Sequence, residues 1–321
     1  MITSLSVFSG CLGLDLGLEM AGLKTIAYVD KDENCHSTIV KNRPKAIVLN
    51  NIFDKNVCRY KNVDIIVGGP PCQSFSTIGK RKFLNCPDGL TMLGFVNIIK
   101  NIKPKMFLME NVQGIISADK GAILKQLIEQ FSQMGYNIDW GVLNSSDFQV
   151  PQIRKRFIMI GNKGKKIELS KATSSKRIIL LKEAIGDLEN KSGACATFSP
   201  LMADFMKKIP EGGNWKSLTP KEQDNAMGAA NRKSGGLTAF YRRLSYDRQS
   251  PTLVASPTHR GTTLCHPRKN RPLSVAEYKR IQGFPDDWII AGSVMNQYRQ
   301  LGNAVPVLMG KALGKLIKDS M

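Results

Sequence analysis

Short apolar segments alternate with helix-length segments along the first half of the chain, and this alternation constrains the fold more than any other feature. Strands that alternate with helices build βαβ units around a mostly parallel sheet, with a ligand crevice at the carboxyl ends of the strands. The sequence therefore predicts an α/β fold for about the first 160 residues. The predicted strands are Leu5–Phe8, Thr25–Val29, Ala46–Leu49, Val63–Val67, Lys105–Met109 and Phe157–Ile160, and the helical segments include Leu93–Lys100 and Gly121–Met134.

Beyond Gly161 the pattern changes to a basic, turn-rich sequence, which indicates a second module. Residues 163–271 contain 21 Lys and Arg against 9 Asp and Glu, a net of +12 out of +20 for the whole chain. The positive charge is therefore concentrated in this module. The last stretch, Tyr298–Met321, returns to an apolar helical pattern that we expect to start at Gly302–Asn303 and to complete the first domain.

Composition sets broad limits on the class of protein. In 321 residues, 42% hydrophobic and 22% charged side chains supply a buried core, which excludes a disordered, collagen-like or coiled-coil chain. The net charge of +20 makes nucleic acid the first partner to consider. Seven cysteines without CxxC pairs predict neither a disulfide framework nor a metal site, and hence a reduced, cytoplasmic location.

The apolar start of the chain resembles a signal peptide in composition, but it has no basic leader and contains Asp15 and Glu19. We expect a strand, a turn and a helix there. No run of about 18 uninterrupted apolar residues occurs, so no membrane span is predicted.

A glycine-containing turn follows the first predicted strand, in the order Phe8-Ser9-Gly10-Cys11-Leu12-Gly13. Glycines here let the backbone approach a cofactor whose polar groups meet the free N–H groups of the next helix. The spacing is not GxGxxG, and a plain packing turn is the alternative. Asp30 ends the second strand, where its carboxylate could accept hydrogen bonds from a ribose diol.

The segment Gly68-Gly69-Pro70-Pro71-Cys72-Gln73-Ser74-Phe75-Ser76 follows another strand. Its glycines and prolines fix an unusual backbone path, and a cysteine at the carboxyl end of a strand is placed as a nucleophile would be. A lone cysteine is usually a small buried hydrophobe, but this context favours a nucleophile.

Two further strand ends carry charged side chains. Glu110 follows Lys105–Met109, so we expect it at the same sheet edge as Cys72, where a carboxyl group could assist attack on an electron-poor ring. The alternative is a helix cap or a solvated carboxylate. Arg154 and Arg156 alternate before the strand Phe157–Ile160, and we expect them on one face as a clamp for a phosphate or base oxygen.

The motifs FSGCLG, GGPPCQSFS, ENV, QIRKR, RIQGFP and QLGNAVP occur in this order, and with them nearly the whole chain resembles the bacterial cytosine-C5 DNA methyltransferase family. The resemblance implies a Rossmann-like domain that binds S-adenosylmethionine (SAM), with S-adenosylhomocysteine as the product, and a smaller, basic target-recognition domain. We expect a catalytic domain over residues 1–165, a recognition domain over 166–290, and a C-terminal segment over 291–321 that completes the first.

The resemblance also implies roles for individual residues. Cys72 matches the nucleophile that attacks C6 of cytosine, and Glu110 the residue that engages N3 and the exocyclic amine, while Arg154 and Arg156 match the pair that orients the site. The residues that match cofactor-binding positions are Phe8, Gly10, Cys11, Leu12, Gly13, Asp30, Lys31, Asn51, Ile52, Pro70, Asn303 and Val305. Two of these depart from the family pattern, because Leu12 replaces a glycine and the uncharged Asn51 replaces an aspartate.

The expected DNA contacts lie in two places. The segment after Cys72 matches a loop that closes over the flipped base, and the basic module carries candidates for phosphate and base-edge contacts. These residues are Gln73, Ser74, Ser76, Lys80, Arg81, Lys82, Arg243, Arg248, Thr252, His259 and Arg260. His259, Cys265 and His266 lack paired zinc-ligand spacing, so no metal site is predicted.

We expect double-stranded DNA as the partner of a monomeric, nucleoid-associated enzyme, with a cognate restriction endonuclease acting separately. Three alternatives remain open: the same chemistry on transfer RNA, a catalytically inactive DNA-binding paralogue, and a SAM-independent dehydrogenase. The basic module favours duplex DNA over RNA. The presence of Cys72, Glu110 and Arg154 disfavours an inactive paralogue, and the glycine spacing disfavours a dehydrogenase.

Overall fold

The computed structural model describes residues 1–71, 87–172, 177–191, 193–228 and 239–321. Within these ranges the chain forms two compact units. The first comprises residues 1–148, 155–176 and 305–321, and the second comprises residues 149–154 and 177–304. No helix in the described ranges combines the length and apolar composition needed to cross a bilayer.

The first unit is built on a seven-stranded sheet in the order β3-β2-β1-β4-β5-β8-β6. The first five strands of this order run parallel, and β8 is antiparallel to both β5 and β6. This confirms the predicted α/β fold and its mostly parallel sheet. The strands are β1 (Thr3–Val7), β2 (Lys24–Val29), β3 (Val48–Leu49), β4 (Ile65–Gly68), β5 (Met106–Asn111), β6 (Asn137–Asn144) and β8 (Lys155–Asn162).

The six predicted strands are all present, but β6 was not predicted. Its side chains are half-buried or exposed along the whole strand, since it lies at the sheet edge, so it has no compact apolar run. It is held by pairing with β8 along its full length, from Asn137 opposite Asn162 to Asn144 opposite Lys155. The predicted strand Ala46–Leu49 is shortened to Val48–Leu49.

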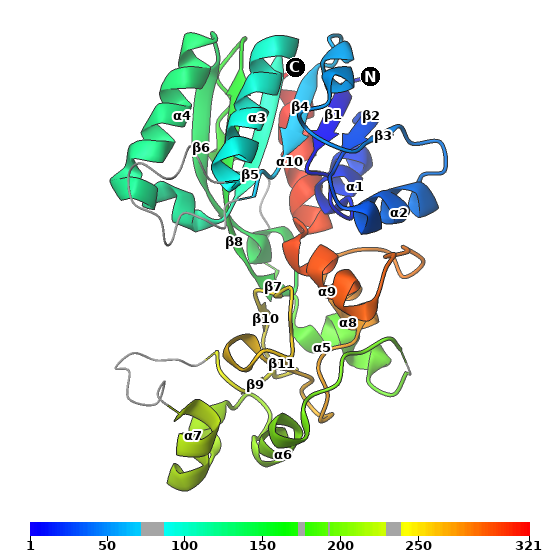
Figure 1. The fold of residues 1–321 in the computed structure, drawn as a ribbon, viewed down its shortest axis with the longest axis vertical. Helices are drawn as coiled ribbons and strands as arrows, with labels where there is room; N and C mark the ends of the chain where they lie inside the picture. The colour runs from blue at the N-terminus through cyan, green and yellow to red at the C-terminus, as the bar shows by residue number, and fades with distance from the viewer. Residues whose placement is uncertain (72–86, 173–176, 192, 229–238) are drawn as a thin grey trace. The chain divides into compact units, whose positions relative to one another are not determined.

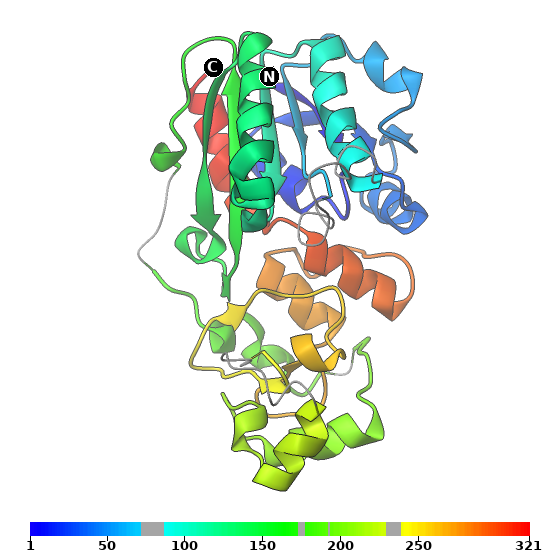
Figure 2. The same ribbon diagram turned by 60° about the vertical axis from the view of Figure 1, so that its left-hand side comes forward.

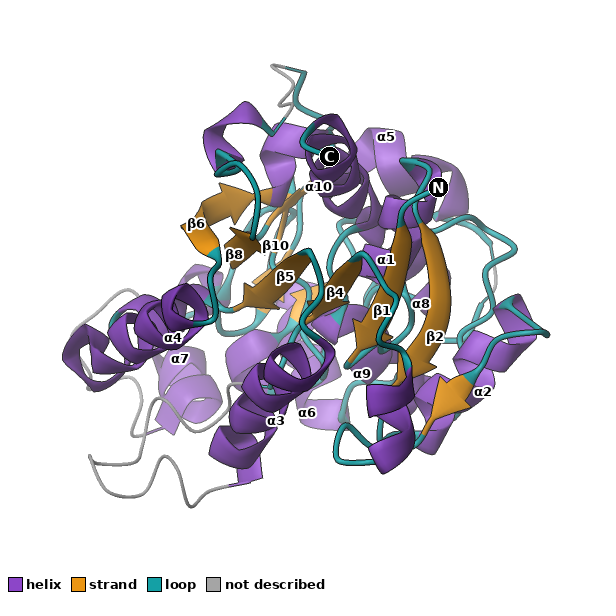
Figure 3. Cartoon of the chain, turned by 90° about the horizontal axis from the view of Figure 1, so that it is seen from above, coloured by secondary structure: helices purple, strands orange, loops and turns teal. Residues whose placement is uncertain are grey.

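Helices cover both faces of this sheet (Figures 1 and 3). On one face, α3 and α4 bury Phe95 and Leu127 against strand residues such as Phe107. On the other face, α1 and α10 pack over Val67 and Leu108. The helices of this unit are α1 (Gly13–Met20), α2 (Glu33–Asn42), α3 (Pro87–Ile102), α4 (Ala122–Gln133) and α10 (Val307–Asp319).

The C-terminal helix α10, red in Figures 1 and 2, belongs to the first unit although it comes last in the chain. It packs against α1 at very short range. A Cβ atom at Gly17 of α1 would lie 2.3 Å from the Val307 carbonyl oxygen, and one at Gly310 would lie 2.8 Å from the Leu14 carbonyl oxygen. Only glycine allows this approach, so these residues tie the end of the chain to its beginning.

The regular elements described in the second unit are mainly short helices, with two short parallel strand pairs, β10-β7 and β11-β9. Its core gathers Phe205, Met206, Trp215 and Tyr241. The elements are α5 (Leu181–Ile185), α6 (Pro200–Lys208), α7 (Pro220–Met227), α8 (Val275–Gln282), α9 (Val294–Asn303), β7 (Gln152–Ile153), β9 (Arg242–Arg243), β10 (Ser250–Pro251) and β11 (Leu264–Cys265). Short 3-10 helices complete both units: η1 (Lys55–Arg59), η2 (Gln113–Ile116), η3 (Ala118–Gly121), η4 (Ser145–Phe148), η5 (Leu169–Lys171), η6 (Gly186–Leu188), η7 (Trp215–Ser217) and η9 (Arg260–Thr262).

The contacts divide the chain at other positions than the sequence suggested. Residues 291–304 lie in the second unit, because α9 packs on α8 through the rings of Tyr278 and Tyr298, whose centroids are 4.8 Å apart. Gly302–Asn303 ends α9 and does not start the last helix, which corrects that prediction. Residues 149–154 also join the second unit, where β7 pairs with β10.

Candidate functional site

The carboxyl ends of four parallel strands meet at one edge of the sheet in the first unit. In the pairing register, Val7 of β1 lies opposite both Val29 of β2 and Gly68 of β4, and Gly68 lies opposite Met109 of β5. The turn from Phe8 to Leu12, Asp30, Gly69 and Glu110 therefore follow one another along this edge. This is the position at which α/β folds bind ligands.

The turn between β1 and α1 has a left-handed backbone at alternate residues. The φ angles are 57° at Phe8, 56° at Gly10 and 70° at Leu12. The conformation is strained at the two residues with side chains, where it costs roughly 1–2 kcal/mol each. Leu12, which replaces the glycine of the family pattern, keeps the glycine-like backbone and buries its side chain to 1% exposure. The neighbouring Cys11 is equally buried, and Gly13 begins α1.

Asp30 braces this turn. Its Oδ2 accepts a hydrogen bond of 2.8 Å from the Gly10 backbone N–H, and its Oδ1 accepts one of 2.9 Å from the Asp32 N–H. Lys31 and Asn51 are exposed, whereas Ile52 is buried. The Asn51 side-chain oxygen accepts a hydrogen bond from the backbone N–H of Phe53. The predicted cofactor positions from Phe8 to Ile52 thus belong to the loops that follow β1, β2 and β3.

Glu110 and Arg156 form a shielded ion pair at the same edge. Arg156 Nε lies 2.9 Å from Glu110 Oε1, and each side chain is only 12% exposed. Burial lowers the pKa of Arg156, and the neighbouring Glu110 carboxylate partly opposes this effect by favouring the charged guanidinium. The pair fixes one carboxylate oxygen and leaves Oε2 toward Gly69, where a Cβ atom would lie 2.7 Å away. A side chain at position 69 would therefore displace the Glu110 carboxylate from this position.

Asn111 connects this carboxylate to the chain after β4. Its Nδ2 donates a 3.1 Å hydrogen bond to the carbonyl oxygen of buried Pro70, and its Oδ1 accepts one from the Val112 N–H. The path of the backbone up to Pro71 is thus held against β5. Sequence reasoning identified Asn111 only as the neighbour of Glu110 and missed this contact.

Seven predicted site residues lie outside the described part of the chain. They are Cys72, Gln73, Ser74, Ser76, Lys80, Arg81 and Lys82.

Arg154 does not pair with Arg156 on one face, which corrects the predicted clamp. It lies between β7 and β8, so the strand alternation is broken at this point. Arg154 is fully buried in the second unit, where it donates hydrogen bonds of 3.2 Å to the Leu253 carbonyl and 2.8 Å to the Gly302 carbonyl. Its guanidinium thus holds two distant backbone segments of that unit together.

A buried amide network, which the sequence did not reveal, supports the same region. Gln152 Nε2 donates to Gln282 Oε1 at 3.0 Å, and Gln152 Oε1 accepts from the Leu253 N–H at 2.9 Å. Gln282 in turn donates to the Ala304 carbonyl. The sequence signal was one glutamine in each of two motifs, Gln152 in QIRKR and Gln282 in RIQGFP.

The two predicted cofactor positions near the C-terminus fall in different units. Asn303 is the last residue of α9 and is exposed in the second unit. Val305 is 7% exposed and belongs to the core of the first unit, in the cluster that α1 and α10 form with the sheet.

The DNA-contact candidates of the second unit differ in exposure. Arg248, His259 and Arg260 are exposed, and Thr252 is half-buried with its hydroxyl donating to the Ile153 carbonyl at 3.0 Å. Arg243 is only 5% exposed, and its guanidinium donates to the carbonyl oxygens of Ile209, Met206, His266, Pro267 and Lys269 and to Asn270 Oδ1. The structure therefore disagrees with Arg243 as a base-edge contact, because its donors are used inside the unit.

His266 and Cys265 are buried, with the Cys265 thiol directed to the Lys269 carbonyl, whereas His259 is exposed and accepts from the Gly261 N–H. Among the described residues, no group of three His, Cys, Asp or Glu side chains is arranged to hold a metal ion.

A mostly parallel sheet with a glycine-containing first turn and polar residues at the carboxyl ends of its strands is the arrangement of a Rossmann-like ligand-binding domain. Residues 2–319 match the family of C-5 cytosine-specific DNA methylases, so the chain belongs to this family. It is a DNA cytosine methyltransferase, a class for which SAM is the methyl donor.

Similar proteins agree with this assignment. The chain is 37% identical over 317 residues to the Type II methyltransferase M.Sau96I of Staphylococcus aureus, covering 96% of this chain and 74% of the relative. It is 35% identical over 328 residues to M.Eco47II of Escherichia coli, covering 98% and 78%. The solved structure of the Entamoeba histolytica methyltransferase EhMeth has the same fold, with a TM-score of 0.73 at 18% identity over 100% of this chain and 99% of that one.

Proposed function

We propose that the chain extrudes one cytosine from double-stranded DNA, bonds Cys72 to C6 of that base and directs a methyl group to C5. The observation that supports this mechanism best is the position of Glu110. Arg156 holds its carboxylate beside Gly69, three residues before Cys72 in the chain. A nucleophile and an acid on neighbouring strand ends suit covalent attack on a pyrimidine ring.

In the proposed reaction, the Cys72 thiolate forms an S–C6 bond and the C5–C6 double-bond electrons move to C5. Glu110 in its protonated form donates its O–H to N3, and its other carboxyl oxygen accepts from the exocyclic amine, so that the proton at N3 neutralises the negative charge entering the ring. SAM, when bound, would supply the methyl group to C5, with S-adenosylhomocysteine as the leaving product. The C5 proton then passes to water, the C5–C6 double bond re-forms, and the Cys72 thiolate is expelled.

Arg156 acts on this reaction through Glu110. Its contact to Oε1 keeps the carboxyl group oriented, and Oε2 remains on the side of the chain that leads to Cys72. Asn111 contributes by fixing Pro70. We propose Arg154 as a positioning residue for the second unit, since its donors serve the Leu253 and Gly302 carbonyls.

The residues of the first turn fit a bound SAM. A Cβ atom at Gly10 would meet no described atom within 4 Å, so the space beside this backbone is open to a ligand. Phe8, Gly10, Cys11, Leu12 and Gly13 would surround it at the start of α1, where free N–H groups favour polar ligand groups. Asp30, Lys31, Asn51, Ile52, Pro70, Asn303 and Val305 complete the proposed binding set.

We propose the second unit as the DNA-recognition domain. Residues 149–154 and 177–304 contain 20 Lys and Arg against 11 Asp and Glu, and this net of +9 supports the role, because phosphate contacts require Lys and Arg. Extruding a stacked base costs a few kcal/mol, which must be recovered from contacts with the strand. We propose Gln73, Ser74, Ser76, Lys80, Arg81 and Lys82 for those contacts near the base, and Arg248, Thr252, His259 and Arg260 for the duplex.

We further propose that the enzyme acts as a monomer with a separate restriction endonuclease as its biological partner. The Type II names of its relatives support the second point. Transfer RNA remains the alternative substrate, and a preference for RNA over duplex DNA in methyl transfer would favour it.

The covalent step can be tested with duplex DNA in which 5-fluorocytosine replaces cytosine. Fluorine at C5 cannot leave as a proton does, so the S–C6 bond should persist after methyl transfer. We expect the wild-type protein with SAM to form an adduct that survives denaturation. Cys72→Ser should form none while still binding SAM in calorimetry.

Glu110→Gln serves as the second variant, because it keeps the size of the side chain but removes its acid. We expect it to bind SAM normally and to form the adduct roughly 100-fold or more slowly. An adduct formed equally by Cys72→Ser would exclude Cys72 as the nucleophile. Adduct formation only with fluorinated RNA would move the proposal to an RNA substrate.

A further inference from the structure

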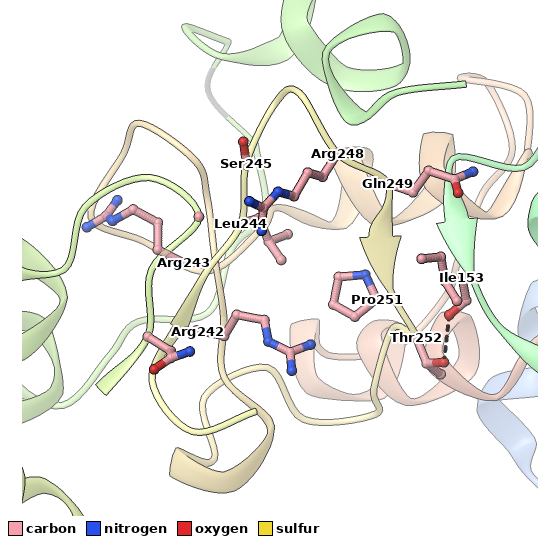
Figure 4. A pocket seen from close by; sticks show the side chains of 11 residues that line it. Ile153, Arg242, Arg243, Leu244, Ser245, Arg248, Gln249, Pro251 and Thr252 are labelled. Atoms are coloured by element: carbon pink, nitrogen blue, oxygen red, sulfur yellow. Dashed lines mark hydrogen bonds between the residues drawn. The ribbon is translucent and has the colours of Figure 1, made fainter. Parts of the chain in front are cut away.

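The second unit contains an open pocket of about 650 Å3 between β9 and β10 (Figure 4). Apolar groups from Ile153, Leu244 and Pro251 form part of its wall. Three arginines, Arg242, Arg243 and Arg248, line it as well, and the described lining residues include no Asp or Glu. The pocket is therefore suited to an electron-rich or anionic group with a flat apolar surface.

The three arginines are held in different ways. Arg243 is buried and bound to backbone carbonyl oxygens, which fixes strand β9. Its neighbour Arg242 must leave the strand on the opposite side, because successive side chains of a strand alternate. In Figure 4, Arg248 ends beside Leu244 and Ser245 and Arg242 extends on the side of Pro251, whereas Arg243 is directed away from Pro251.

Arg242 is half-buried and belongs to an anchored strand, whose residues 242 and 243 pair with Leu264 and Cys265 of β11. Burial lowers its pKa from the ordinary arginine value, though an arginine remains charged at neutral pH. Arg248 is exposed and lies in the turn before β10. The guanidinium of Arg242 is thus held in place by its strand, whereas that of the exposed Arg248 can adjust its position to a phosphate.

We propose that this pocket receives the major-groove edge of a guanine in duplex DNA, that Arg242 reads the base, and that Arg248 anchors a neighbouring phosphate. This inference rests on the proposed function. The planar fork of a guanidinium matches the O6 and N7 acceptors of guanine with two parallel hydrogen bonds. An exposed arginine at the rim supplies charge without base selection.

The two roles predict different losses. Arg242→Lys keeps the charge but removes the two-pronged geometry, so discrimination should fall roughly 10- to 100-fold at one guanine position. Arg248→Ala should keep the sequence preference and weaken DNA binding uniformly, with the slope of log affinity against log salt smaller by about 1. Arg59→Ala removes an exposed arginine of the first unit, outside the pocket, and serves as the matched control.

The experiment expresses the wild type and the three variants in a bacterial host without cytosine methylation and maps methylated cytosines by bisulfite sequencing. Duplexes of the wild-type motif with 7-deazaguanine at each guanine are then compared in binding. Loss of N7 at one position should weaken the wild type roughly 10-fold and leave Arg242→Lys unaffected, which keeps the test informative even if that variant is inactive.

An Arg242→Lys variant with the wild-type preference and the wild-type response to 7-deazaguanine would overturn the proposal. So would a uniform loss of affinity on Arg242→Lys, or a motif without guanine other than the partner of the target cytosine. If the wild type methylates nothing, the proposed function itself fails. If the wild type methylates a motif but the variants do not show the predicted changes in preference or affinity, the proposed function is supported and this inference is wrong.

Discussion

At the scale of single residues, the contact between Glu110 and Arg156 fixes the orientation of the carboxylate. Glu110 is the last residue but one of β5, and Arg156 gives its carboxylate one orientation. A single unpaired carboxylate at this depth would favour its neutral form, because burial penalises charge. The ion pair therefore determines what the strand end can do in the reaction.

His266 is fully buried in the second unit, and both ring nitrogens have polar partners. Its Nδ1 accepts hydrogen bonds from the backbone N–H groups of Arg268 and Lys269 at 3.1 and 3.0 Å, so the proton of the neutral ring is on Nε2. Nε2 faces the Tyr246 hydroxyl at 3.2 Å and the Glu277 carboxylate at 3.4 Å. Burial is the main cause that lowers the pKa of His266 to about 4.

We predict that lowering the pH from about 6.5 to about 4 reduces the free energy of unfolding. The unfolded chain takes up a proton on His266 in this window and the folded chain does not, so the loss reaches about 3 kcal/mol. Urea titrations over this range should show a shallower pH dependence for His266→Gln than for the wild type. His259→Gln, which changes an exposed histidine, should keep the wild-type dependence. Equal slopes for wild type and His266→Gln would contradict the prediction.

The sequence could place site residues on strand ends but could not supply their partners. Cys72, Glu110 and Asp30 were assigned from the strand that precedes each one. Arg154 was assigned to a clamp with Arg156 from the alternation of the two residues. Its actual partners, the Leu253 and Gly302 carbonyls, lie 99 and 148 positions further along the chain. Local alternation carries no information on such distant carbonyl groups, so only the structure could show that Arg154 is buried and which groups it binds.

At the scale of elements, the packing of α1 on α10 attaches the C-terminal helix to the first unit. The carbonyl oxygen of Val307 would lie 2.3 Å from a Cβ at Gly17, and backbone cannot move aside as a flexible side chain can. The two helices therefore approach only where glycine faces backbone.

We predict that Gly17→Ala lowers the free energy of unfolding by about 1–3 kcal/mol through overpacking. Chemical denaturation, with hydrogen exchange of α1 and α10 as a local probe, measures this. Gly141→Ala is the matched control, because a Cβ on this β6 residue would meet no atom within 4 Å. It should change stability by less than about 0.5 kcal/mol. A Gly17→Ala variant as stable as Gly141→Ala would show that the helices separate without cost.

Periodicity predicted those elements that bury a continuous apolar stretch. The six strands with such runs were found, whereas β6, with its half-buried residues, was not. The end of α9 at Gly302–Asn303 was taken as a helix start, because a glycine-asparagine pair fits either end of a helix. The packing of α9 within the second unit makes this pair a helix end, and such packing cannot be inferred from the sequence pattern.

At the scale of the whole molecule, the chain combines a mostly parallel α/β unit with a second unit that carries +9 of the net charge of +20, because residues 163–176 of the basic stretch belong to the first unit. The family assignment covers residues 2–319 and therefore includes both units. Fold class and activity follow from ordered motifs, which are local in sequence. The base preference that we propose depends on Arg242, whose strand is fixed by contacts of Arg243 within the second unit.

The most direct test of the central claim is bisulfite sequencing of DNA from a host without cytosine methylation that expresses this chain. We predict protected cytosines confined to one short sequence motif, and none when Cys72→Ser is expressed at the same level. Unprotected DNA in cells that contain folded, SAM-binding protein would contradict the account, as would protection that persists in Cys72→Ser.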